Sequence, residues 1–313
     1  MRGGGTGTGI LLAFGSLILL GMMPVIANSR PAGLDALAFA FALSVWQVVF
    51  AVPLFAVELR GPDRGVFRPG VMTRTWRRGL VVALSTGAMF GLSTYLYVLG
   101  AEKAGATNAA IAIQAYPLFA ILWESLFLGR RKTTVELSLT GLLIGALYYL
   151  GTGGTWQMTG VSPWFLVALG VPFLWSIAHV IIREELTSTP VTPAQVTFFR
   201  VAISTVFLAA LMAIVEPERL HAGLLPALFG AHAVFMGLVY YLELIVWFYA
   251  VRHIDVSLAS SITTPWPALT MVLAAIFLGD AIETYQVGAL AVVVACIYGL
   301  TLASLRKQKA AAE

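Results

Sequence analysis

Ten long runs of apolar residues, separated by short polar segments, dominate the pattern along the chain. They fall at about 9–28, 34–58, 79–101, 105–128, 135–151, 163–182, 195–215, 228–250, 255–278 and 284–305. Most are close to the roughly 20 residues that a helix needs to cross a bilayer. Helices are predicted throughout, because an unclosed strand would leave backbone polar groups bare in lipid. The first run is too long for the apolar core of a signal peptide, so we expect an uncleaved first transmembrane helix.

The composition agrees with this pattern. Of 313 residues, 59% are hydrophobic and only 11% are charged, and the mean hydropathy is +0.88. A soluble domain carries about a quarter charged residues, so soluble enzymes and disordered chains are excluded. The one cysteine, Cys296, lies in an apolar run and rules out an intramolecular disulfide and a cysteine metal site. The chain is predicted to be an all-α polytopic membrane protein with ten transmembrane helices.

Lysine and arginine indicate the orientation of these helices, since they gather on the cytoplasmic side of a membrane. With the N-terminus in the cytoplasm, fifteen of the 19 basic residues lie on that side and three lie outside. The fifteen are Arg2, Arg60, Arg64, Arg68, Arg74, Arg77, Arg78, Arg130, Arg131, Lys132, Arg183, Arg252, Arg306, Lys307 and Lys309; the three are Arg30, Lys103 and Arg219. We therefore expect both termini to be cytoplasmic. The arginine-rich segment 59–78 is interpreted as a topology anchor, with anionic lipid binding as the alternative.

An internal repeat appears when the chain is shifted by 150 residues. The segment 110–129 then lies over 260–279, with Pro117 on Pro267 and the Phe-Leu-Gly ending of one on that of the other. The same shift aligns Ser93 with Glu243, and Tyr97 with Trp247. The predicted repeats are 1–155 and 156–313. Five helices per repeat is an odd number, so the two halves should enter the membrane in opposite senses, as in many secondary transporters.

With these motifs the chain resembles the EamA family of the drug/metabolite transporter superfamily, and within it YddG-type amino-acid exporters. The resemblance implies two inverted five-helix repeats around a central cavity in a bacterial inner membrane. Family members often carry an arginine near the start of the second helix of each repeat; Arg200 fits this position, and Gln47 stands there in the first half. The family's acidic residue after Leu-Gly is Asp280 in the second half, whereas Arg130 stands in the first.

Proline and aromatic residues mark matching depths in the fourth and ninth runs. Proline in mid-helix frees the carbonyl four residues earlier, here that of Ile113 and of Thr263. Each proline follows an aromatic residue near the expected midplane, and Gln114 lies close by. These residues either line a cavity that binds substrate or only bend and pack helices. The residues concerned are Tyr116, Pro117, Trp266 and Pro267, and Pro24 and Pro172 are further expected helix breakers.

Glu243 is the most informative single residue. It lies near the centre of the eighth run, where an ionised carboxylate is costly unless it is paired or hydrated. Tyr240 and Trp247 lie three and four residues away, on the same helical face. A carboxylate beside aromatic rings can bind an ammonium group or carry a proton. The alternative is a paired or protonated structural residue.

A second polar group is expected nearer the cytoplasmic side. It consists of Glu124, Trp175, His179 and Arg200. Its role is either a gate or carboxylate-binding site at Arg200 or His179, or an Arg200–Glu124 pair that ties helices together. The neighbouring Glu184 and Glu185 are interpreted as a solvated loop edge.

No Walker loop, prenyl-phosphate motif, Gly-x-Ser-x-Gly or His-Glu-x-x-His occurs, so neither an enzyme nor a cofactor or metal site is expected. The predicted function is secondary transport of small metabolites, foremost export of aromatic or neutral amino acids by alternating access. A carrier of organic cations or drugs is the alternative, and a lipid-modifying membrane enzyme the second class. The expected partners are a small-molecule substrate, membrane lipids and a proton or other ion, with no nucleic acid and a monomeric state.

Overall fold

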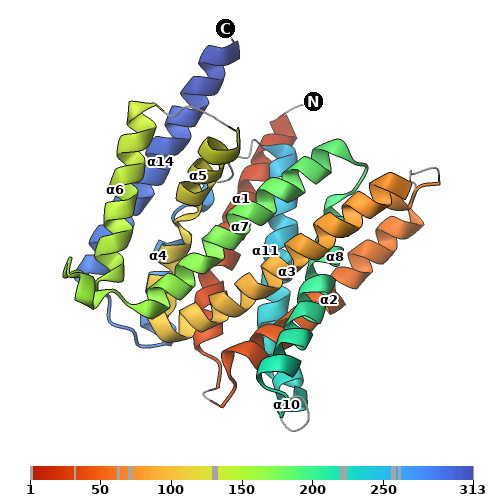
Figure 1. Cartoon of the computed structure of the whole chain (residues 1–313), viewed down its shortest axis with the longest axis horizontal. Coiled ribbons are helices and arrows are strands. Elements are labelled where there is room, and N and C mark those ends of the chain that lie inside the picture. The colour runs from red at the N-terminus through yellow and green to blue at the C-terminus, as the bar shows by residue number, and fades with distance from the viewer. Residues whose placement is uncertain are drawn as a thin grey trace. The chain divides into compact units, whose positions relative to one another are not determined.

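The computed structural model of the chain describes residues 3–31, 33–61, 64–69, 73–128, 133–218, 224–254, 259 and 262–312, and within these ranges the secondary structure is helical (Figure 1). The α-helices are α1 Gly3–Asn28, α2 Ala36–Arg60, α3 Thr73–Ala104, α4 Ala106–Ile113, α5 Tyr116–Leu128, α6 Thr134–Gly151, α7 Pro163–Ser188, α8 Pro193–Val215, α10 Leu224–Phe229, α11 Ala231–His253, α13 Trp266–Phe277 and α14 Thr284–Ala312. Two short 3₁₀ turns, η1 Gly65–Phe67 and η2 Met158–Gly160, lie in connections.

Eight of the described segments are long and apolar enough to cross a membrane. They are Gly7–Asn28, Ala36–Arg60, Arg77–Ala104, Ala106–Trp123, Thr134–Gly151, Pro163–Ile182, Ala194–Val215 and Thr284–Ala303, and Ala231–Trp247 and Trp266–Phe277 are shorter apolar helices. All of them coincide with predicted runs. The all-α polytopic fold class is confirmed.

Local sequence signals explain where several of these helices begin. The Asp35 carboxylate accepts the first backbone N–H groups of α2. Capping boxes open α6, through Thr133 and Glu136, and α8, through Thr192 and Gln195. Such caps satisfy N–H groups that have no partner within the helix.

The chain forms two compact units. Unit 1 comprises Met1–Ser29, Gly100–Phe173 and Val246–Glu313, and unit 2 comprises Arg30–Leu99 and Leu174–Ile245. In unit 1, α1 and α4 pack against α13. Helix α6 packs along α14 (Figure 1). In unit 2, α2 packs along α8 and against α10. Three helices, α3, α7 and α11, contribute residues to both units.

The fourth and ninth predicted helices are broken rather than continuous. A turn at Gln114 and Ala115 separates α4 from α5, and a turn at Thr264 and Pro265 precedes α13. Each break comes just before the aromatic-proline pair. The prolines are therefore the second residues of new helices, a position at which a missing N–H costs little.

Glu185 corrects a second expectation. It lies inside α7, which continues to Ser188, and only 4% of it is exposed. The six-residue extension beyond the predicted end at residue 182 buries the carboxylate, so Glu185 is not part of a solvated loop edge. Part of the predicted loop 59–78 is also helical, because α3 already begins at Thr73.

Gly237 offers a test of the packing between α11 and α2. A Cβ at this position would lie 2.5 Å from the Trp46 Cβ and 2.8 Å from the Leu43 carbonyl oxygen. We expect Gly237→Ala to lower the stability by about 1–3 kcal/mol, because the two backbones must separate. Gly141→Ala in α6 is the control, since a Cβ there meets nothing within 4 Å and alanine favours helix. Thermal unfolding in detergent should show a lower Tm only for Gly237→Ala; equal Tm values would contradict this packing.

Candidate functional site

Arg200 is the centre of a buried polar and aromatic cluster in unit 2, which we call the Arg200 cluster. It consists of Phe90, Ser93, Thr94, Tyr97, Trp175, His179, Arg200, Tyr240 and Glu243, drawn from α3, α7, α8 and α11. Arg200 lies about two turns inside α8 and is 7% exposed. Its guanidinium carbon lies 3.4 Å from the centroid of the Phe90 ring. This contact is a cation–π interaction, which compensates part of the cost of burying the charge.

The α3 residues of the cluster occur at helical spacing. Ser93, Thr94 and Tyr97 lie three, four and seven positions after Phe90. At this spacing the four residues share one face of α3. The hydroxyls of Ser93 and Thr94 both donate to the Phe90 carbonyl, at 3.0 and 2.8 Å. These local bonds fix both side chains against the helix that carries them.

Two α7 side chains pack onto this face. The Trp175 indole N–H donates to the Ser93 hydroxyl oxygen at 2.9 Å, and its ring lies nearly parallel to that of Tyr97, with centroids 6.5 Å apart. His179 lies one turn further along α7, with its ring 5.5 Å from Phe90 and 6.4 Å from Trp175. The spacing of four residues thus presents both rings to the same neighbours.

Tyr240 and Glu243 bring α11 into the cluster. The Tyr240 ring lies 6.3 Å from that of Tyr97, and Tyr240 and Glu243 are 2% and 8% exposed. Arg200 interacts electrostatically with both of them. A fixed cation and a carboxylate thus lie among aromatic rings in one compact unit.

Five of the residues singled out from the sequence therefore lie together: Trp175, His179, Arg200, Tyr240 and Glu243. The sequence reasoning did not choose the α3 residues as site residues. Two signals point to them: the helical spacing from Phe90 to Tyr97, and the repeat shift, which aligns Ser93 with Glu243.

The predicted midplane residues lie at the helix breaks of unit 1. The Gln114 side-chain amide donates to the Thr264 carbonyl, joining the two breaks. That carbonyl is available because residue 267 is proline and because the Ala268 N–H bonds to Pro265 instead. Thr263, Thr264 and Trp266 are buried, whereas Tyr116 is half-buried.

The remaining predicted residues lie elsewhere. Trp247 belongs to unit 1, where it packs against an apolar cluster of Ala13, Ala250, Ile254 and Ala259. Pro24 and Pro172 are buried within α1 and α7 without ending either helix. The side chain of Glu124 lies outside the described residues, so the predicted Arg200–Glu124 pair stays a prediction.

Unit 1 also has an open cavity of about 260 Å³ between the start of α4 and the connection that follows α13. Its lining includes Asp280, Asn108 and Gln286. The Gln286 amide donates to the Asn108 side-chain oxygen at 2.9 Å and its oxygen accepts the Glu283 N–H. The lining is thus polar and is held by the cap of α14.

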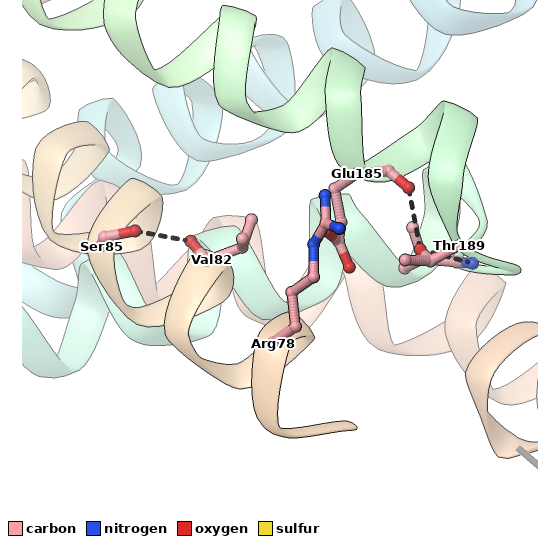
Figure 2. Close-up of polar contacts among 6 residues, drawn as sticks. Arg78, Val82, Ser85, Glu185 and Thr189 are labelled. Carbon is pink, nitrogen blue, oxygen red and sulfur yellow. Dashed lines mark hydrogen bonds and ion pairs between the residues drawn. The ribbon is translucent and has the colours of Figure 1, made fainter. Parts of the chain in front are cut away.

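An ion pair connects α3 and α7 within unit 2. Figure 2 shows Arg78 reaching from α3 toward Glu185 on α7, and the Arg78 Nε atom lies 3.1 Å from the Glu185 carboxylate. The Thr189 hydroxyl donates to the Glu185 backbone carbonyl at 2.8 Å (Figure 2). The arginine side chain is 50% exposed and the carboxylate 6%, so the pair leaves the guanidinium in contact with solvent while the carboxylate is buried.

Removal of one partner should cost more than removal of both. We expect Arg78→Ala to destabilise by about 1 kcal/mol, because a buried carboxylate loses its counter-ion on a partly solvated side. Adding Glu185→Gln should restore most of the lost stability, while the exposed neighbour Arg77→Ala has little effect. Thermal unfolding of the four proteins measures this cycle. Additive losses in the double variant would show that the two side chains are not coupled.

The chain is similar in sequence and in fold to known proteins. A "Probable terminal-alkyne amino-acid exporter" of Streptantibioticus cattleyicolor is 26% identical over 261 residues, covering 81% of this chain and 82% of that protein. A protein of known crystal structure has a similar fold, with a TM-score of 0.61 and 19% identity over 98% of this chain and 99% of that one. The model of the EamA-like transporter family matches residues 7–152 and 162–302. The resemblance inferred from the motifs is thereby confirmed, and the chain belongs to the EamA-like transporter family.

Proposed function

We propose that this membrane transporter exports amino acids, foremost aromatic or neutral ones, and that the Arg200 cluster binds them. The observation that carries the proposal is the burial of opposite charges, Arg200 and Glu243, among aromatic rings in one unit. An amino acid is a zwitterion and carries the complementary pair. The similarity to a protein described as a probable amino-acid exporter supports this choice.

Glu243 is assigned to the ammonium group. The Tyr240 side chain lies one turn away on α11 and interacts electrostatically with Glu243, and the Tyr97 phenol also interacts with the carboxylate. Ring faces beside a carboxylate add about 0.5–2 kcal/mol of cation–π attraction each for an ammonium ion. A buried carboxylate is expensive within a membrane, and a cationic ligand would offset that cost.

The transport cycle is assigned to alternating access between the predicted repeats 1–155 and 156–313. No ATP-binding motif occurs in the sequence, so an ion gradient or the substrate gradient supplies the energy. We place both termini in the cytoplasm from the distribution of lysine and arginine. The helix breaks before Pro117 and Pro267 give discontinuous helices of the kind found in many secondary transporters.

A carrier of organic cations is the second candidate. Glu243 and its aromatic neighbours would also suit a cation that has no carboxylate. Arg200 favours the amino acid, because a buried guanidinium in the same cluster repels a substrate that carries only positive charge.

Counterflow in proteoliposomes tests the proposal. We expect wild-type protein loaded with unlabelled phenylalanine to accumulate labelled phenylalanine, and Glu243→Gln to lower the initial rate at least tenfold because the ammonium loses its counter-charge. Glu218→Gln, an exposed carboxylate of unit 2, is the matched control and should transport normally.

Two outcomes would contradict the proposal at different levels. Counterflow of organic cations but of no amino acid would exclude amino-acid transport. A wild-type rate for Glu243→Gln with every amino acid tested would remove Glu243 from the site.

A further inference from the structure

Two buried phenol hydroxyls in the Arg200 cluster have no hydrogen-bond partner among the residues that the structure describes. They belong to Tyr97 and Tyr240, which are 3% and 2% exposed. Tyr240 approaches Thr94 and Arg200 without reaching hydrogen-bond geometry with either. Folded proteins pair nearly all of their buried polar groups, so each exception calls for an explanation.

The protons of the neighbouring hydroxyls are already donated elsewhere, so neither Ser93 nor Thr94 donates to a phenol. Ser93 donates to the Phe90 carbonyl and accepts from the Trp175 indole, and Thr94 also donates to the Phe90 carbonyl. The indole is therefore unavailable to Tyr97, although the two rings lie nearly parallel. Local bonds hold the surrounding side chains, whereas the phenol rings pack against neighbouring rings.

One of the two phenols, that of Tyr240, lies beside a permanent cation. Tyr240 interacts electrostatically with Arg200, and its ring lies next to that of Tyr97. The flat face of the guanidinium rests on Phe90, and its N–H groups lie in the plane of the guanidinium, directed away from that contact. The cluster therefore combines a charged fork of donors with two O–H groups that have not found an acceptor.

These groups match the chemistry of a carboxylate. Its two oxygens accept several hydrogen bonds and fit the guanidinium fork. Glu243 lies in the same cluster and would repel a ligand that is only anionic. A zwitterion avoids this repulsion, because its ammonium faces Glu243 while its carboxylate faces the donors.

We propose that Tyr97, Tyr240 and Arg200 form the carboxylate-binding part of the transport site, in which the two phenol hydroxyls become hydrogen-bonded only when the ligand is present. The inference rests on the proposed function and deepens it. A site whose buried donors require a ligand acceptor discriminates strongly against an analogue that lacks it. The transporter therefore selects solutes with a free carboxylate and rejects simple amines.

Removing each hydroxyl separates this role from a structural one. Tyr97→Phe and Tyr240→Phe keep the rings and their packing. If the hydroxyls have no partner in the empty protein, each variant should unfold at the same or a higher temperature than the wild type. Each should also bind phenylalanine about tenfold more weakly. Tyr241→Phe is the control: its ring packs against Ala51 and Val201, and it should leave phenylalanine binding unchanged.

Phenethylamine is the second probe, because it is phenylalanine without the carboxylate. Purified wild-type protein should bind it at least tenfold more weakly than phenylalanine, and the Tyr97→Phe and Tyr240→Phe variants should bind it as the wild type does. Thermal stabilisation across a concentration series gives both affinities.

The results also separate the inference from the proposed function. If Tyr97→Phe and Tyr240→Phe both bind and transport phenylalanine like the wild type, the carboxylate assignment is wrong and amino-acid transport stands. A lower unfolding temperature with equal losses for both probes would show that the hydroxyls are structural, and would overturn the inference in the same way. Wild-type protein that binds phenethylamine but no amino acid would overturn both.

Discussion

The contact between the Arg200 guanidinium and the Phe90 ring is the interaction around which the polar interior of unit 2 is built. A guanidinium keeps its charge in a protein, so an apolar bundle that contains one must compensate it. The ring provides part of that compensation, and Glu243 and Tyr240 provide electrostatic partners from α11. The identity of residue 200 thus constrains which residues α3 and α11 present to α8.

A second constraint comes from proline. Pro267 has no N–H group, and the Ala268 N–H bonds to the Pro265 carbonyl. The Thr264 carbonyl therefore lies outside the regular hydrogen-bond pattern of the helix. An unsatisfied carbonyl is costly away from water, and the Gln114 amide satisfies it from the turn between α4 and α5. One hydrogen bond therefore connects the two positions at which the chain departs from helical geometry.

Much of the fold could be predicted from the sequence, because apolar length and cap residues act locally. The run predicted at 195–215 is α8, which a capping box opens at Thr192. The carboxylate of Glu185 was misplaced because its counter-ion, Arg78, lies 107 positions away in the chain. Helical spacing alone could not reveal that partner, nor the breaks at Gln114 and Thr264.

The candidate site was predictable where one residue type was conspicuous in an apolar run, as with Glu243 and Arg200. Phe90, Ser93 and Tyr97 are ordinary residues of a membrane helix, and only the three-dimensional contacts show what they do. Trp175 both packs near the Tyr97 ring and donates its indole N–H to Ser93. No spacing within α7 could specify a bond to α3.

The composition of the two compact units has a consequence for the order in which the chain can fold. Unit 1 joins α1, α4, α5 and α6 with α13 and α14, and unit 2 pairs α2 with α8. Neither unit is continuous in sequence, so helices made early in synthesis pack against helices made late. The apolar face of α1 that packs on α13 therefore has no protein partner until nearly the whole chain has been made.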